Sequence, residues 1–188
     1  QIITDTTTRA TAETKTPATL ALFKATALYA NAGTNDQVEA YLGVASKDIP
    51  EDSTSDGTVT AGGTITVTAT GTTYSTTYCA ASFSLSLFSA SNKGVMSNVG
   101  VYGDKFTAAS QCVWADVKGG ADVTAASVAI ASNNYANVTA VMTSGWDVGA
   151  ITSSKATAET RADTDTRAFV EDGAAITSTS GDVSITSY

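Results

Sequence analysis

The chain has 188 residues, an apolar fraction of 43%, a formal charge of −8 and no histidine. This length suits one domain or a short run of stacked repeats, and the acidic charge argues against binding to nucleic acid or, by charge, to anionic membranes. No apolar stretch reaches the roughly 18 residues of a membrane-spanning helix, and without histidine a zinc site or a Cys-His nucleophile is excluded.

The chain begins with a Thr-rich, weakly patterned segment, and residues 10–14 recur without change as residues 156–160. One interpretation is an ordinary exposed edge strand. The other is assembly, because an extended terminal segment with unpaired backbone groups completes the sheet of a neighbouring subunit in donor-strand fibres. The candidate assembly strand consists of Ile2, Ile3, Thr4, Thr6, Thr8, Ala10 and Ala12.

Most of the chain alternates apolar with small polar residues. Residues 19–32 fit either a short helix or a strand, and this choice stays open. Residues 64–68, 82–88, 127–130 and 182–186 have period-two alternation, which predicts strands with one buried face. Turn signals such as Asp56-Gly57, Gly119-Gly120 and Asp172-Gly173 lie between them. We therefore expect a single all-β unit over residues 1–188.

Three degenerate repeats occupy about residues 38–69, 113–131 and 166–187. Ala115 and Ala168 hold the same place in two copies, 53 residues apart, which is close to two coils of a β-solenoid at roughly 20 to 30 residues each. The interval from Ala40 to Ala115 is 75 residues, and most of the excess is expected in residues 44–56. A parallel β-helix is favoured, with a β-sandwich of jelly-roll or donor-strand type as the alternative.

The third repeat carries a resemblance to a known family. Residues 167–174 read Arg-Ala-Phe-Val-Glu-Asp-Gly-Ala, and residues 181–186 read Gly-Asp-Val-Ser-Ile-Thr. These stretches resemble the repeat units of large secreted adhesins of the filamentous-haemagglutinin and leukotoxin-like type. The resemblance implies a right-handed parallel β-helix in an extracellular fibre or surface adhesin. The earlier copies depart from it, since Gly43-Val44 and Gly119-Gly120 replace the Asp-Gly pair.

Two covalent features are predicted. Cys79 and Cys112 both lie on expected strands, and a disulfide between them is plausible in a secreted chain, with two buried thiols as the alternative. Asn137 begins the glycosylation sequon Asn137-Val138-Thr139.

Carboxylates gather in two groups. Asp163, Asp165, Glu171 and Asp172 lie within one expected strand and turn, and Asp48, Glu51, Asp52 and Asp56 form the second group. Such a density of hard oxygen ligands suits calcium, the one candidate cofactor, whereas the alternative is a solvated acidic face.

Catalysis is not expected, because the usual general base and the common nucleophile and phosphate-loop motifs are missing. Trp114 and Trp146 are expected to pack in the core or between coils. The sequence predicts a mature extracellular or cell-surface structural protein, after signal-peptide removal, that assembles with copies of itself into a filament or adheres to host or matrix glycans. The alternatives are a secreted polysaccharide-binding or polysaccharide-cleaving domain and a calcium-dependent β-sandwich.

Overall fold

The computed structural model describes residues 1–15, 17–43, 57–80, 83–100, 111–143 and 145–188. Every regular element in these ranges is a β-strand, which confirms the all-β prediction. Residues 19–32, whose type the sequence left open, belong to a strand rather than a helix.

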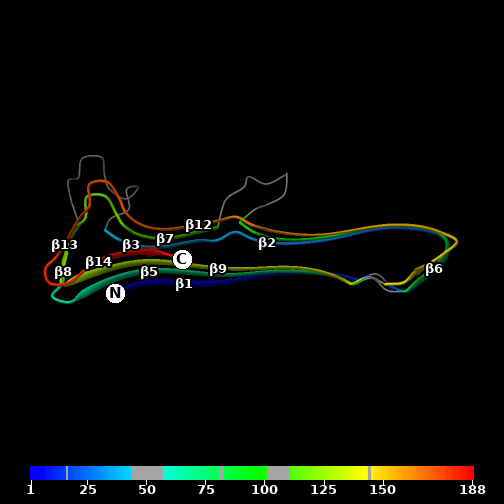
Figure 1. The fold of residues 1–188 in the computed structure, drawn as a ribbon, viewed down its shortest axis with the longest axis horizontal. Helices are drawn as coiled ribbons and strands as arrows, with labels where there is room; N and C mark the ends of the chain where they lie inside the picture. The colour runs from blue at the N-terminus through cyan, green and yellow to red at the C-terminus, as the bar shows by residue number, and fades with distance from the viewer. Residues whose placement is uncertain (16, 44–56, 81–82, 101–110, 144) are drawn as a thin grey trace.

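The chain follows nearly the same path three times (Figure 1). The first circuit contains β1 (Ile2–Lys15), β2 (Thr19–Thr34), β3 (Gln37–Leu42) and β4 (Thr58–Thr60). The second contains β5 (Thr64–Ala80), β6 (Ser84–Val99), β7 (Gln111–Val117) and β8 (Asp122–Ala125). The third contains β9 (Ser127–Thr143), β10 (Asp147–Val148), β11 (Ile151–Ala162), β12 (Thr164–Val170) and β13 (Ala175–Ser178). The strand β14 (Val183–Ser187) then begins again beside β9.

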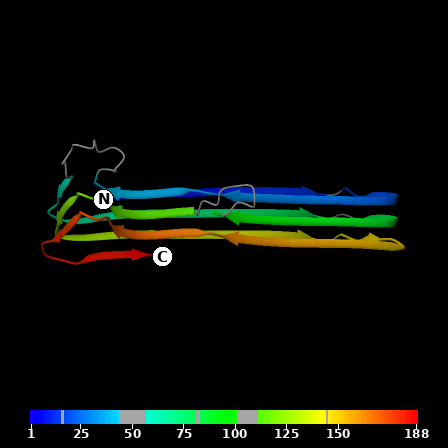
Figure 2. The same ribbon diagram turned by 90° about the horizontal axis from the view of Figure 1, so that it is seen from above.

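Each strand pairs with its counterpart in the next circuit, and all these pairings are parallel. Figure 2 shows the circuits lying side by side. The three repeats meet in this arrangement, since Ala115 lies between Ala40 and Ala168.

The predicted coil length was wrong. Ala115 and Ala168 are direct ladder neighbours, so their interval of 53 residues is one circuit rather than two. Long strands such as β5, with 17 residues, make each circuit about twice as long as the sequence suggested.

The longer interval between the first two copies also has a different origin from the one expected. The offset between circuits is 65 residues at Thr19–Ser84, 75 at Gln37–Cys112 and 64 at Thr58–Asp122. The connection between β6 and β7 is therefore about ten residues longer than the one between β2 and β3. The connection between β3 and β4 is longer than the one between β7 and β8 by a similar number. Residues 44–56, between β3 and β4, thus account for only about half of the amount by which the Ala40–Ala115 interval exceeds the Ala115–Ala168 interval.

The apolar core fills the end of the molecule where β3, β7 and β12 face the start of β5 and β9, with β4, β8 and β13 closing the third side (Figure 1). Its centre consists of small and β-branched side chains, including Val67, Val113, Val117 and Val123, all almost fully buried. β-Branched residues suit this place because they pack well on a pleated surface.

Beyond this core the two layers, β5 with its neighbours and β2 with β6, approach through small hydroxyl residues. Ser75 donates a hydrogen bond to the Ala32 carbonyl at 3.1 Å, and Ser97 donates to the Ser75 hydroxyl at 2.8 Å. Thr77 donates to the Met96 carbonyl at 2.8 Å. Side chains this short reach the opposite backbone only if the layers lie closer than the roughly 10 Å usual for packed sheets.

Glycine permits a close contact between the layers and a tight corner of the circuit. A Cβ atom added to Gly71 would lie 2.5 Å from Cγ2 of Val113 on the opposite layer. Gly120 and Gly173, one circuit apart, take φ values of 77° and 83° at the same corner, a conformation that other residues rarely adopt.

Candidate functional site

The predicted assembly strand is an edge strand. Ile2, Ile3, Thr4, Thr6, Thr8, Ala10 and Ala12 all lie on β1, which pairs with β5 on one side and ends its sheet on the other. Ile3 faces outward, whereas the other six face the interior and are half-buried. Thr4 also donates a hydrogen bond to the Glu39 carbonyl at 3.1 Å. Among the described residues, the second edge of β1 therefore has no strand beside it.

The opposite end of the stack is open as well. The strand β14 pairs with residues 128–132 of β9, and the Tyr188 carbonyl accepts a hydrogen bond from the Asn134 N–H. Residues 135–143 of β9 are left with one unpaired edge in the described chain. Residues 135–143 correspond in register to residues 7–15 of β1. The two ends of the stack thus present matching open edges of parallel strands.

A charged cluster around Lys118 crosses all three circuits. The Lys118 ammonium lies 2.5 Å from Glu39 of the first circuit, 2.6 Å from Asp116 of the second and 3.1 Å from Glu171 of the third. The backbone N–H of Gly119 donates to the other oxygen of Glu171 at 2.9 Å. The ammonium thus contacts one carboxylate from each of the three circuits and links the circuits to one another.

The cluster shifts the ionisation of its members. Burial lowers the pKa of Lys118, but hydrogen bonds to the three carboxylates outweigh burial and raise it above the ordinary lysine value. Burial raises the pKa of the Asp116 carboxyl, against the opposing effect of Lys118. The Gly119 N–H lowers the pKa of Glu171 despite its partial burial, and Lys118 adds to that effect. Neighbouring carboxylates in the sequence give no sign of this cluster, because it depends on register between circuits.

The predicted calcium ligands do not converge. Glu171 contacts Lys118, whereas Asp165 accepts a hydrogen bond from Arg167 at 2.6 Å on β12. Asp163 precedes β12, and Asp172 lies in the turn after it. In the described part of the chain, no group of three or more acidic or cysteine side chains gathers closely enough to hold a metal ion. The second acidic group, Asp48, Glu51, Asp52 and Asp56, lies outside the described residues.

The predicted disulfide is not formed. Cys79 is buried between the layers beside Ala30 and Val95, whereas Cys112 lies on β7 between Gln37 and Asp165. The sequence showed that both lie on strands, but not that these strands belong to different sheets. Burial, assisted by the nearby Asp165 charge, raises the pKa of the Cys112 thiol.

Asn137 lies exposed on the outer side of β9, and Thr139 of its sequon donates to the Asn137 side chain at 3.1 Å. Its glycosylation stays a prediction.

The two tryptophans differ from each other. Trp114 makes an edge contact with Phe169 of the next circuit, as expected for a packing residue, but Trp146 is 77% exposed and does not belong to the core.

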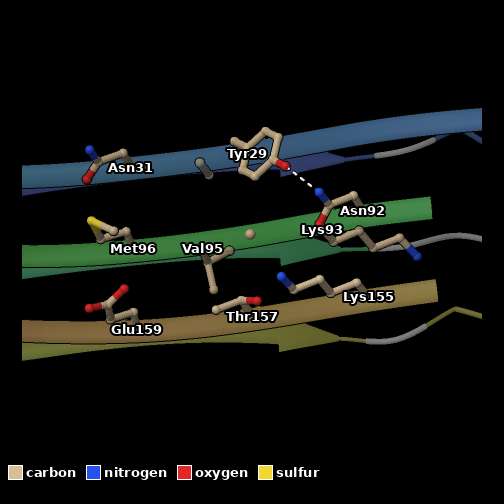
Figure 3. A pocket seen from close by; sticks show the side chains of 11 residues that line it. Tyr29, Asn31, Asn92, Lys93, Val95, Met96, Lys155, Thr157 and Glu159 are labelled. Carbon is tan, nitrogen blue, oxygen red and sulfur yellow. Dashed lines mark hydrogen bonds between the residues drawn. The ribbon is translucent and has the colours of Figure 1, made fainter. Parts of the chain in front are cut away.

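A groove of about 370 Å³ crosses the outer face of β2, β6 and β11 (Figure 3). The exposed Tyr29 ring lies over Gly94, and its hydroxyl accepts a hydrogen bond from Asn92 at 2.6 Å. Lys155 and Glu159 line the other side of the groove. This combination of an aromatic ring, side-chain amides and charges is open to solvent and suits a polar ligand.

The end of the molecule farthest from the apolar core is polar inside. Lys24 Nζ lies 3.2 Å from Asp147 Oδ1, and Asp147 also accepts hydrogen bonds from Ser84 and Ser91. The Ser84 hydroxyl, followed by Lys24, lowers the pKa of Asp147 in spite of burial. Sequence patterns give no sign of this partly buried pair, because Lys24 and Asp147 belong to the first and third circuits.

Helices able to cross a membrane are not found in the described ranges. No family model, curated protein or solved structure matches the chain.

Proposed function

We propose that the chain is a structural segment of an extracellular fibre or surface adhesin, folded as a parallel β-solenoid. The parallel pairing of every strand with its counterpart one circuit later supports the solenoid over the sandwich, whose sheets are antiparallel. The repeated sequence units lie in neighbouring circuits, as expected for a chain that grows by adding coils.

The open edges carry the functional proposal. A parallel edge offers a row of unpaired N–H and C=O groups, and a strand of another coil pairs with it by sheet extension. Here β1 is open at one end of the stack and β9 is partly open at the other, in matching register. A contact of this kind joins unlike surfaces, so it repeats without closing and produces a filament.

The interior clusters support a mechanical role. Lys118 binds a carboxylate from each circuit, and the hydroxyls of Ser75 and Ser97 join the two layers. These contacts hold stacked coils in register. The extracellular location is proposed from the Thr/Ser-rich composition and from the adhesin-like repeats.

Proline substitution in β1 tests edge-to-edge extension. Successive backbone N–H groups of a strand point to opposite sides. One of the two residues Thr7 and Thr8 therefore directs its N–H toward β5, and the other directs its N–H toward the open edge. We expect one of the variants Thr7→Pro and Thr8→Pro to lower the melting temperature, and the other to leave it nearly unchanged while shortening the filaments.

Negative-stain imaging and sedimentation at increasing concentration, with and without calcium, measure this. Filaments in the wild type that shorten in only the edge-directed proline variant support the proposal. Isolated short rods at every concentration would refute self-assembly and leave the chain as one stretch of a longer solenoid. A strongly helical spectrum would refute the structural proposal altogether.

The groove at Tyr29 favours a second candidate function, binding of host or matrix glycans. Exposed aromatic rings stack on sugar faces, and the neighbouring Asn31, Asn92 and Glu159 offer hydrogen bonds to hydroxyls. A glycan array with the wild type, Tyr29→Ala and the matched outward variant Tyr135→Ala tests it. Glycan binding that only Tyr29→Ala removes would support an adhesive role.

A further inference from the structure

The end farthest from the apolar core carries an exposed apolar surface, which we call the apolar tip. Several members are strongly exposed, among them Leu20 at 80% and Phe23 at 70%. Together they expose on the order of 1,000 Å², above the few hundred Å² of the largest apolar patch on most soluble monomers. The apolar tip consists of Leu20, Leu22, Phe23, Phe83, Leu85, Leu87, Phe88, Trp146, Val148 and Ile151.

The side chains of the tip form ladders across the three circuits. Leu85 lies between Leu20 and Val148, and Phe88 lies between Phe23 and Ile151. The Phe23 and Phe88 rings stack with centroids 5.1 Å apart. The exposed surface is thus a regular feature of all three circuits and not a single misplaced residue.

The alternation at the tip is the reverse of the expected one. Residues 82–88 were predicted to bury their apolar face, but Ser84 and Ser86 face inward while Phe83 and Leu85 face outward. The interior there is occupied by the Lys24–Asp147 pair and its serine partners. The apolar side chains of the tip are therefore exposed to water, and a cover from outside would remove this apolar surface from water.

The tip is convex. Leu22 and Phe23 are consecutive and both exposed, as are Leu87 and Phe88, which marks a corner where the strands turn from one layer to the other. Figure 1 shows this corner at the right-hand end of the ribbon. Apolar side chains therefore project around a narrow edge rather than from one flat face.

The local charge differs from that of the whole chain. Residues 19–30, 83–95 and 145–158 carry three lysines, Lys24, Lys93 and Lys155, and a single carboxylate, Asp147, which gives +2 in a chain of −8. Asp147 is turned inward, whereas Lys155 is exposed behind the tip. The general argument against membrane binding from net charge does not hold for this end.

We propose that the apolar tip inserts into the interfacial layer of a lipid bilayer, with Lys155 near the phosphates. A fluid lipid layer covers a convex apolar end on all sides, whereas a second copy with the same convex tip would bury only its apex. Aromatic and aliphatic side chains with adjacent lysines are typical of such shallow insertion. Pairing between circuits gives most backbone N–H and C=O groups at the tip a hydrogen-bond partner. The backbone there can therefore enter the interfacial layer without leaving these groups unpaired. This inference is independent of filament formation.

The chain contains two tryptophans, and one of them reports on the tip. The variant Trp114→Phe leaves Trp146 as the single fluorophore. We expect its emission to shift to the blue on addition of phosphatidylcholine vesicles, more strongly when phosphatidylglycerol is included, and to be quenched by brominated acyl chains. An unchanged spectrum at all vesicle concentrations would overturn the proposal.

A double variant distinguishes insertion of the apolar tip from nonspecific binding of the protein to vesicles. Phe23→Asp combined with Leu85→Asp changes only outward positions, so its strand spectrum is expected to stay, while its vesicle partition falls at least about tenfold. Tyr135→Asp, an exposed aromatic on β9 away from the tip, is the matched control and is expected to bind within about twofold of the wild type. Equal loss in both variants would overturn the proposal. Lipid-independent dimers that only the tip variant abolishes would also overturn it, in favour of a second copy.

Discussion

The Lys118 ammonium lies 2.5 Å from the Glu39 carboxylate, 79 residues earlier in the chain and one circuit away. The same ammonium contacts the fully buried Asp116. Removing it leaves a buried carboxylate without its counter-charge. We expect Lys118→Met to lower the free energy of unfolding by about 3 kcal/mol, measured by urea denaturation.

The double variant Lys118→Met with Asp116→Asn is the control for this substitution. It removes both buried charges, so it is expected to recover much of the lost stability. Equal destabilisation in the single and double variants would show that packing, and not the buried charge, explains the loss.

Asp147 makes the stability of the tip dependent on pH. The Ser84 hydroxyl and Lys24 lower its pKa below the ordinary value of 3.8, so its contribution is present at neutral pH and is lost as the pH falls through the lowered pKa. We expect Asp147→Asn to be less stable than the wild type at pH 7, with a difference that shrinks below about pH 4. Urea denaturation across this range measures it, and a constant difference down to pH 2 would contradict the assignment.

Gly71 sets the spacing between β5 and the layer that contains Val113. The Cβ of Gly71→Ala would overlap Val113, and we expect a loss of about 1–3 kcal/mol in unfolding free energy. Gly62→Ala is the matched control, because nothing lies within 4 Å of its added Cβ. Combining Gly71→Ala with Val113→Ala should relieve part of the overlap. Similar melting temperatures for the two single variants would contradict this close approach.

The all-β class and many strand positions could be predicted from sequence, because period-two alternation directly reflects the pleat. The circuit length could not. The similar segments mark one corner of each circuit, and nothing in Ala115 or Ala168 reveals whether one circuit or two separate them. Only the register decides.

Which face of a strand is buried could not be predicted from the sequence either. Alternation in residues 82–88 shows two different faces, but which one is buried depends on what the interior contains. Here Lys24 and Asp147, distant in sequence, make the interior polar and turn Leu85 outward. The Lys118 cluster escaped prediction for the same reason, since each partner comes from a different circuit.

Ser75 and Ser97 test the hydroxyl contact between the layers. Ser75 is fully buried and links Ser97 to the Ala32 carbonyl, so Ser75→Ala leaves two polar groups without this partner. We expect a loss of about 1–2 kcal/mol, while Thr76→Ala, one residue away on the outer side, changes stability by less than about 0.5 kcal/mol. A double-mutant cycle with Ser97→Ala should give a coupling energy clearly different from zero. Additive losses would show that the two hydroxyls act independently.

The two cysteines give a direct test of the arrangement of the strands. Since no disulfide joins them, we expect two thiols to be titrated in denaturant without reductant. In the native protein, Cys79 at 1% exposure should react only on unfolding. Cys112 is more accessible, but burial and Asp165 raise its thiol pKa, which lowers its thiolate population and slows alkylation.

Removing the Asp165 charge should therefore speed alkylation of Cys112, so Asp165→Asn is expected to react faster than the wild type at the same pH, with Asp122→Asn on β8 as a control that leaves the rate unchanged. A native protein without titratable thiols would mean that Cys79 and Cys112 are linked. That link would require β5 and β7 to leave the positions that the register between circuits gives them, because the two cysteines lie in different sheets and Cys79 faces the interior.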